Sequence, residues 1–327
     1  MKKRNKTVVI FLLTFAMLLL LAWWAINAGS IKVSWGQILK GLFIEYDREV
    51  ALIYNLRFPR IFIAIFAGAG LAVAGILLQA VLKNPLADPG IIGISSGAGF
   101  FTVLGIALFP TLVFITPVLA FIGGAVAFLI VYSIAWIGGA KPVRIILVGI
   151  AIHAMFEGLL RMLNYMSGQR LSQVTAIVEG NIAVRAWADV KILAIGITVG
   201  LIMAYLTAGR CNLLSLSKKT VSGLGLRVNV IRLYISAIAI LLACTCTAVV
   251  GGISFLGLIV PHIGRLLVGK NHKILIPYTA LLGAVVYLAA DTLGKTVAYP
   301  YEIPAAILMA VIGGPCFILL LRRSKIS

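Results

Sequence analysis

The sequence predicts an all-α integral membrane protein with about ten spanning helices. Hydrophobic residues make up 62% of its 327 residues and charged residues only 11%, whereas soluble domains carry about 45–50% apolar and about 25% charged residues. Apolar runs recur from one end of the chain to the other, so no segment has the polar surface of a soluble domain. We therefore interpret residues 1–327 as a single membrane domain.

The first spanning helix is predicted over residues 8–26. Lys2, Lys3, Arg4 and Lys6 precede it, as basic residues precede the apolar part of a secretory signal. The run has 19 residues, which exceeds the roughly 7–15 residues of that apolar part, and similar runs follow it. We therefore predict a membrane-spanning helix and not a cleaved signal.

Nine further runs approach the length of about 20 mostly apolar residues that a spanning helix needs. Gly and Pro interrupt the runs at 91–109 and 252–268. Broken helices are tolerated in membranes only where neighbours or a cavity satisfy the freed backbone groups, so a transport pathway is sought near these two. The nine runs are 61–80, 91–109, 113–137, 145–166, 190–208, 233–250, 252–268, 274–293 and 304–321.

The basic residues predict the orientation of the chain. The net charge is +19, from 28 Lys and Arg against 9 Asp and Glu. The Lys and Arg residues stand singly or in small groups between apolar runs, unlike the basic face of a nucleic-acid-binding protein, so no nucleic-acid partner is expected. With the N-terminus inside, 18 of the 28 fall on the inner side and 10 on the outer side. This excess predicts that both termini are cytoplasmic.

Three connections are longer than a turn requires. Residues 27–60 and 167–189 are predicted to lie outside, and residues 209–232 inside. The inner segment mixes apolar, Ser and basic residues and is too polar to span the membrane. A structured cytoplasmic loop of this size indicates a contact with another protein.

Catalytic and metal-binding patterns are weak throughout the chain. The stretch from Gly264 to Asn271 approaches a phosphate-binding loop, but it closes an apolar helix and ends in Asn, where that motif has Ser or Thr. The four cysteines form no CxxC pair, so neither a disulfide frame nor a metal site is expected. His153 is one of three isolated histidines and, although it could meet a haem iron, is interpreted as a packed residue. We expect no enzyme, no ATP site and no bound cofactor in this chain.

Glu157 and Arg161 lie four residues apart in the run at 145–166. Ionisable residues within a span are functional candidates because burying them is costly, while their spacing also fits an ion pair within one helix. The pair is therefore a candidate pathway element or a structural ion pair. Asp291 and Lys295 repeat the spacing. Two isolated acids make a poor proton relay, which disfavours a proton-coupled carrier without excluding it.

Short motifs stand in order along the chain from residue 56 onward. They are LRFPR at Leu56–Arg60, KNPLADPG at Lys83–Gly90 after Gln79, GISSGA at Gly93–Ala98, FLGLIVPHI at Phe255–Ile263 followed by Arg265, ADTL at Ala290–Leu293, EIP at Glu302–Pro304 and IGGP at Ile312–Pro315. Together they resemble the signature of the FecCD permeases, the membrane subunits of ABC importers for ferric siderophores, haem and cobalamin. Residues 1–55, with the first helix and an external segment, precede the part that resembles the family.

The resemblance implies ten helices in each subunit and a dimer of this chain with itself or a close paralogue, with the pathway between the two permeases. It also implies two cytoplasmic ATPase subunits, which bind ATP and Mg²⁺, and an external substrate-binding protein or lipoprotein. Basic positions that meet acidic residues of the binding protein fall on Arg57, Arg60 and Lys295. At Glu179–Ile182 the chain lacks the Trp and the Gly-Ser pair that are usual in the family.

The segment 209–232 matches the part of the family that contacts the ATPase. By this resemblance the coupling residues are Leu213, Leu214, Ser215, Leu216, Ser217, Gly223, Leu224 and Gly225. The expected function is ATP-driven import of an iron chelate, a ferric siderophore or haem, across the bacterial cell membrane. Import of cobalamin is the alternative in the same class, and a proton-coupled carrier or a polytopic membrane enzyme are the alternatives in other classes.

Overall fold

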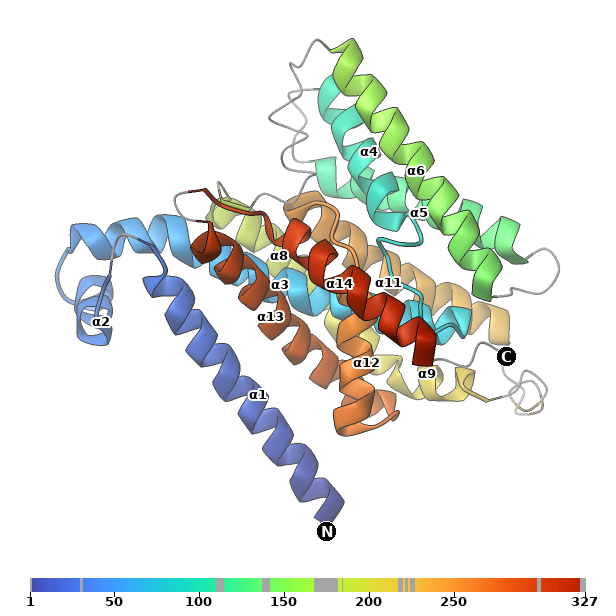
Figure 1. Ribbon diagram of the computed structural model, residues 1–327, viewed down its shortest axis with the longest axis horizontal. Coiled ribbons are helices and arrows are strands. Elements are labelled where there is room, and N and C mark those ends of the chain that lie inside the picture. The colour runs from blue at the N-terminus through green and yellow to red at the C-terminus, as the bar shows by residue number, and fades with distance from the viewer. Residues whose placement is uncertain are drawn as a thin grey trace.

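The computed structural model describes residues 2–29, 32–109, 115–136, 142–167, 182–183, 185–216, 220, 223, 227–298 and 301–323. Within these ranges the regular structure is helical and includes no strand. Figure 1 shows the helices packed side by side around a long central helix, α3. The helices are α1 (Lys2–Asn27), α2 (Trp35–Phe43), α3 (Arg48–Leu82), α4 (Ile94–Leu108), α5 (Thr116–Trp136), α6 (Pro142–Met166), α8 (Trp187–Leu206), α9 (Ala208–Leu214), α11 (Val228–Val250), α12 (Leu256–Val268), α13 (His272–Val297) and α14 (Ala305–Arg323).

Every apolar run that predicts a spanning helix coincides with one of these helices. Within the described ranges, seven helices, α1, α3, α5, α6, α8, α11 and α13, are long and apolar enough to cross a membrane. Three others, α4, α12 and α14, hold shorter apolar stretches. The all-α polytopic fold that the sequence predicts is confirmed.

α3 forms the centre of the bundle and packs against α13, α11, α8 and α12. Its small residues let these neighbours approach closely. A Cβ atom on Gly75 would lie 2.1 Å from the carbonyl oxygen of Gly257 in α12, and one on Gly68 would lie 2.3 Å from the carbonyl oxygen of Gly283 in α13. Glycine at helix interfaces in membranes allows the backbones to touch.

α3 begins well before the predicted span at 61–80. Asp47 caps it, because its side chain accepts hydrogen bonds from the backbone N–H groups of Glu49 and Val50. The helix then runs through Pro59 without ending. The LRFPR motif, which the sequence places in an external connection, therefore lies on a helix.

α4 and α12 both start at a sharp break in the chain. Their N-cap residues, Gly93 and Phe255, have left-handed backbones with φ of 86° and 68°. Between these breaks lies Asp88, which is fully buried and accepts hydrogen bonds from the N–H groups of Gly90 and Ile91 at 2.9 and 3.2 Å. The interruptions that Gly and Pro predict in these two runs are therefore observed.

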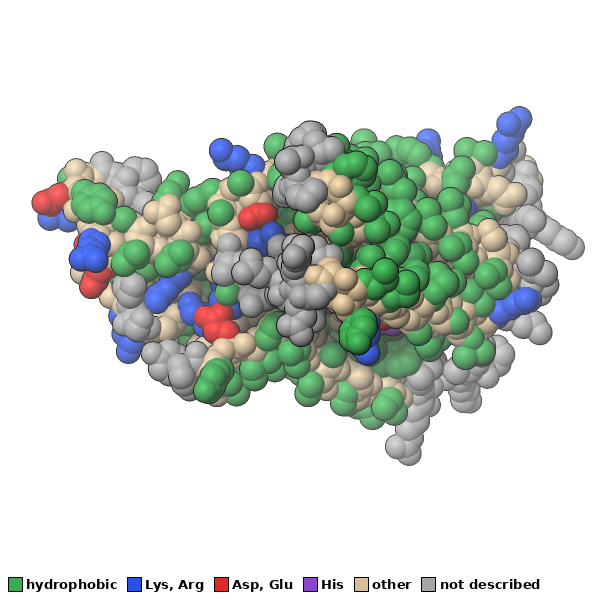
Figure 2. Space-filling model, turned by 90° about the horizontal axis from the view of Figure 1, so that it is seen from above, with side chains coloured by type: hydrophobic (Ala, Val, Ile, Leu, Met, Phe, Trp, Pro, Cys, Tyr) green, Lys and Arg blue, Asp and Glu red, His purple; other side chains and the backbone are tan. Residues whose placement is uncertain are grey.

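Large apolar side chains cover much of the outer surface. Leu20, Leu147, Ile195 and Leu206 are each more than 60% exposed, and they stand on three different helices, α1, α6 and α8. Figure 2 shows apolar surface as a broad area over the body of the molecule, while charged side chains lie toward its two ends and acidic and basic side chains stand together toward the end formed by α2. Exposed apolar surface on this scale is typical of a protein surrounded by lipid.

Candidate functional site

Five charged residues meet at the end of the bundle where α2 and the first turns of α3 lie, which we call the α2 end. Arg60 of α3 makes two hydrogen bonds to Asp291 of α13, Nε to Oδ2 at 2.8 Å and Nη2 to Oδ1 at 3.0 Å. Its Nη1 donates to Oε2 of Glu302 at 2.6 Å. The side chains of Arg60 and Asp291 are only 10% and 7% exposed, whereas that of Glu302 is 40% exposed.

Arg57 and Lys295 lie beside this ion-paired group. Arg57 sits one turn before Arg60 on α3, is half-buried, and donates from Nη1 to the carbonyl oxygen of Ile26 at the end of α1. A Cβ atom on Gly29 would lie 3.1 Å from Nη2 of Arg57 and 3.6 Å from Cε of Lys295. The structure thus brings all three predicted docking residues to one end of the bundle.

Arg60 and Lys295 differ in their surroundings. Arg60 is buried against two carboxylates. In the described part of the chain, Lys295 is half-buried and has no carboxylate within 4.0 Å. Asp291 and Glu302 stand in the ADTL and EIP motifs, and no sequence pattern pairs either of them with Arg60. Their pairing with Arg60 joins residues 231 and 242 positions apart.

α9 contains the first of the predicted coupling residues and lies at the other end of α3, which we call the α9 end. Cys211 and Leu214 of α9 are buried, Leu213 is half-buried, and Ser215 and Leu216 are exposed. The carbonyl oxygen of Leu216 accepts a hydrogen bond from Nζ of Lys83 at 2.6 Å.

The rest of the predicted coupling residues are only partly described. Among the described residues, a Cβ atom on Gly223 would have no contact within 4 Å. Ser217, Leu224 and Gly225 lie outside the described residues.

The side chain of Asn212 ties α9 to the start of α13. Its Nδ2 donates to Oδ1 of Asn271 at 2.9 Å. Its Oδ1 accepts from the backbone N–H of His272 at 2.9 Å and lies 2.7 Å from Nδ1 of the same residue. These contacts link α9 to α13, the helix that also carries Asp291 and Lys295 at the α2 end.

Glu157 and Arg161 are both on α6, as predicted. Glu157 is half-buried and Arg161 is exposed. The ion pairs found among the described residues do not include this pair at a distance of 4.0 Å or less. Asp291 and Lys295 likewise form no such pair, because Asp291 faces Arg60. The spacing of four residues alone therefore does not bring the charged groups together in either helix.

Asp88 is the most deeply buried carboxylate near the breaks of α4 and α12. It lies in the connection between α3 and α4, outside the candidate membrane spans. Burial raises the pKa of its carboxyl group to about 6, while hydrogen bonds from the surrounding backbone N–H groups act in the opposite direction. The negative charge that remains at neutral pH lies beside the first turn of α12, where hydrogen bonds from the N–H groups of Phe255 and Gly257 and the helix dipole favour it.

The chain is similar over nearly its whole length to known proteins. The profile of the FecCD transport family matches residues 17–323. The probable heme-iron transport system permease proteins of Staphylococcus aureus strains MSSA476 and USA300 are 37% identical to this chain over 322 residues, which is 98% of each protein.

Solved structures have the same architecture. One, described as an inward-facing conformation of a metal-chelate type ABC transporter, matches with a TM-score of 0.80 and 29% identity over 96% of this chain and 99% of the other. The PsaBC structure from Streptococcus pneumoniae shares the fold alone, with a TM-score of 0.57 and 16% identity over 87% of this chain and 94% of the other. Because the family profile covers nearly the whole sequence, the chain belongs to the FecCD transport family.

Proposed function

We propose that this chain is the permease subunit of an ABC importer that moves an iron chelate, haem or a ferric siderophore, into the bacterial cytoplasm. The observation that carries the proposal is 37% identity to the heme-iron permeases over 98% of both proteins. The metal-chelate transporter, with a TM-score of 0.80, supports the same class of cargo. The bundle of apolar helices supplies the membrane body that such a subunit requires.

In this proposal the chain supplies the pathway and the contact surfaces, and separate subunits supply the energy. Two permeases, identical or closely related, enclose the pathway, and two ATPase subunits bind ATP and Mg²⁺ on the cytoplasmic side. An external binding protein delivers the chelate. The distribution of Lys and Arg supports cytoplasmic termini, which puts the α2 end outside and the α9 end in the cytoplasm.

The charged group at the α2 end is the proposed docking site for acidic residues of the binding protein. Arg57 and Lys295 are the half-buried members and are placed to meet a partner. Arg60 is held by Asp291 and Glu302 beneath them, so its role in docking is to fix the relative positions of α3 and α13. Charges at the rim of an interface act mainly on association rate and specificity.

The segment 209–232 is the proposed contact with the ATPase. Leu213 and Leu214 pack α9 onto the bundle, while Ser215 and Leu216 face outward. The hydrogen bonds of Asn212 to Asn271 and His272 support the transfer of an ATPase movement to α13. Such a movement is of the rigid-body kind that couples subunits in many transporters.

The pathway is proposed to run near the breaks of α4 and α12, since irregular backbone at membrane depth is tolerated where it lines a cavity or is buried in protein. Glu157 and Arg161 on α6 remain candidate pathway residues because ionisable groups in a span are costly to keep without a function.

Purified permease, reconstituted with its ATPase and binding protein, tests the proposal and identifies the cargo. The binding protein is loaded in turn with haem, a ferric siderophore or cobalamin, and ATP hydrolysis is measured. We expect stimulation by an iron chelate and none by cobalamin. Stimulation by cobalamin alone would replace the proposed cargo, and hydrolysis that ignores every loaded binding protein would contradict the importer.

A further inference from the structure

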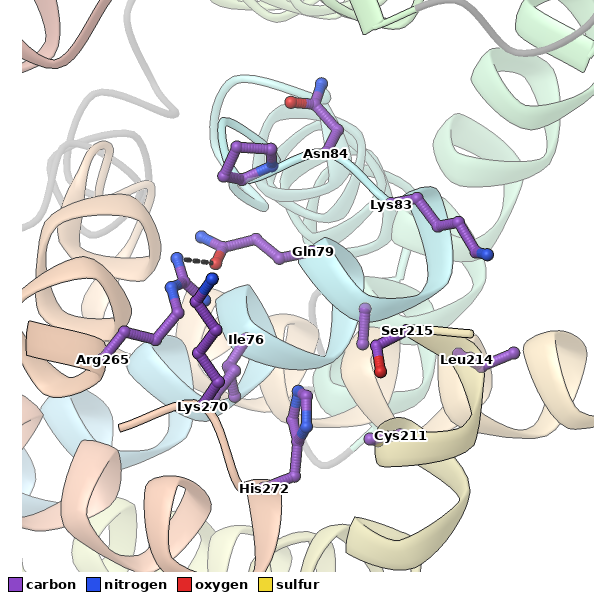
Figure 3. A pocket seen from close by; sticks show the side chains of 12 residues that line it. Ile76, Gln79, Lys83, Asn84, Cys211, Leu214, Ser215, Arg265, Lys270 and His272 are labelled. Carbon is purple, nitrogen blue, oxygen red and sulfur yellow. Dashed lines mark hydrogen bonds between the residues drawn. The ribbon is translucent and has the colours of Figure 1, made fainter. Parts of the chain in front are cut away.

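A cavity of about 410 Å³ opens at the α9 end, between the last turns of α3 and α12, α9 and the first turn of α13. Three of its lining residues are Lys83, Arg265 and Lys270, with His272 beside them, and the part of the lining that the structure describes includes no Asp or Glu. Figure 3 shows Arg265 and Lys270 next to Gln79, with His272 directed into the space between them and α9.

Local backbone geometry brings two of these cations together. α12 ends where the N–H of Gly269 donates to the carbonyl oxygen of Arg265 at 3.1 Å. Gly269 has a φ of 88°, in the left-handed region that glycine enters readily. The chain turns sharply there, so that Lys270 lies over the same cavity as Arg265.

The cations of this cavity have neutral partners. Nη2 of Arg265 donates to Oε1 of Gln79 at 2.6 Å, and Nζ of Lys83 donates to the carbonyl oxygen of Leu216 at 2.6 Å. In the described part of the chain, neither they nor Lys270 has a carboxylate within 4.0 Å. At the α2 end, by contrast, Arg60 has two carboxylates.

The excess of basic residues on the cytoplasmic side of membrane proteins accounts for isolated lysines near the lipid surface. It does not account for their convergence. Here a half-buried Arg and an exposed Lys enter one concave site together with polar Gln, Ser and His side chains. A guanidinium and an ammonium group in a partly enclosed site favour an anionic group, because charge-assisted hydrogen bonds are the strong ones.

We propose that this cavity receives a carboxylate side chain of the ATPase subunit. Its wall includes Leu214 and Ser215, two of the proposed coupling residues, so a subunit bound to the coupling segment reaches the cavity directly. The proposal rests on the function proposed above. It adds a second contact to the coupling segment, in which an acidic side chain bridges α9, α12 and α13.

The geometry gives this contact a mechanical role. Asn212 joins the cavity wall in α9 to His272 in α13 by two contacts of 2.9 and 2.7 Å. Arg265 joins α12 to Gln79 near the end of α3. A carboxylate seated among these groups contacts three helices at once, so that a movement of the ATPase displaces them as a unit.

The test compares two charge reversals three residues apart. Lys270→Glu places a negative charge at the cavity, and Lys270 is exposed and makes no ion pair among the described residues, so the fold is expected to persist. Lys273→Glu is the matched control, because Lys273 is also exposed but does not line the cavity. Affinity of the ATPase for the full-length permease in nanodiscs is measured at low and high salt.

We expect Lys270→Glu to weaken ATPase binding by about tenfold or more at low salt, and Lys273→Glu by less than about threefold. A scan of acidic-to-Lys substitutions on the ATPase is expected to yield one that restores binding to Lys270→Glu and weakens binding to wild type. Equal affinities for wild type and Lys270→Glu would overturn the inference and leave the proposed function standing.

Two further results separate the alternatives. If the wild-type permease fails to bind the ATPase at all, the proposed function fails and this inference fails with it. Nanodiscs with and without anionic phospholipid distinguish a lipid headgroup as occupant. If Lys270→Glu alters the retention of anionic lipid but not ATPase affinity, the cavity binds a lipid phosphate and the inference is overturned.

Discussion

Replacing Asp291 with Asn removes the charge that faces Arg60 at the junction of α3 and α13. The wild-type pair is bidentate, at 2.8 and 3.0 Å, and both side chains are at most 10% exposed. Asn retains the size of the side chain but presents one acceptor and no charge. Arg60 then keeps Glu302, which is 40% exposed, as its charged partner.

The structure sets the expected size of the effect. Removing one partner of a buried ion pair costs about 3–5 kcal/mol, since the other charge is left buried without compensation. Because Glu302 still contacts Nη1 of Arg60 at 2.6 Å, we expect Asp291→Asn to cost about 3 kcal/mol, the lower end of that range. Glu302→Gln removes the more exposed partner and is expected to cost about 1 kcal/mol.

Denaturant titration of the purified permease in detergent measures these differences in the free energy of unfolding. Glu45→Gln is a control, since Glu45 forms an exposed ion pair with Lys40 at 3.6 Å and its loss should leave stability unchanged. A cycle with Arg60→Gln, Asp291→Asn and the double variant isolates the pair. Additive single effects, or a loss below about 1 kcal/mol for Asp291→Asn, would refute the assigned role of this ion pair.

Three other predictions test separate parts of the structure. Gly75→Ala should destabilise the permease by more than about 3 kcal/mol, because the new Cβ would lie 2.1 Å from a backbone oxygen of α12. Gly158→Ala is the control, because a Cβ atom there would have no contact within 4 Å among the described residues. Equal unfolding midpoints for the two variants would contradict the close contact. Arg57→Glu combined with Lys295→Glu should slow association with the binding protein more than about tenfold at low salt and less at high salt, and an unchanged association rate in surface plasmon resonance would reject the docking site. Asp88 has a raised pKa, about 6 against an ordinary 3.8, so between these pH values the folded state binds more protons than the unfolded state. The free energy of unfolding of wild type, relative to that of Asp88→Asn, should therefore rise by about 1 kcal/mol from pH 7 to pH 5. A difference that stays constant in denaturant titrations at the two pH values would show that Asp88 does not titrate there.

The spanning helices could be predicted from the sequence because the signal is local. A run of about 20 apolar residues has few structural alternatives in a membrane. The breaks of α4 and α12 could be found for the same reason, since Gly and Pro interrupt their runs. α3 starts earlier than its apolar run predicts, because the segment Arg48–Arg60 is not apolar enough for a span and its helix depends on the Asp47 cap and on packing.

The charged site shows where sequence reasoning stops. Arg57, Arg60 and Lys295 could be singled out through the resemblance to a family, but their different degrees of burial could not. Burial of Arg60 follows from Asp291 and Glu302, more than 230 residues away, and such contacts leave no local pattern. The i,i+4 spacing of Asp291 and Lys295 pointed to a different pair, since spacing on one helix carries no information on what a neighbouring helix offers.

The cavity at the α9 end illustrates the same limit. Arg265 and Lys270 are close in sequence, but Gln79 at the end of α3 and Lys83 just after it come more than 180 residues earlier, and only the packed structure brings them to one site. In the sequence these residues read as ordinary inner-loop charges of a membrane protein.

ATP-driven import is tested most directly by uptake of the chelate into proteoliposomes that contain the permease and its ATPase. ATP and Mg²⁺ are enclosed on the ATPase side, the loaded binding protein is added on the other, and an ionophore abolishes any proton gradient. We expect the iron chelate to cross the membrane only when hydrolysable ATP is present, with or without a proton gradient. Uptake that persists without ATP and stops when the proton gradient is abolished would contradict this expectation.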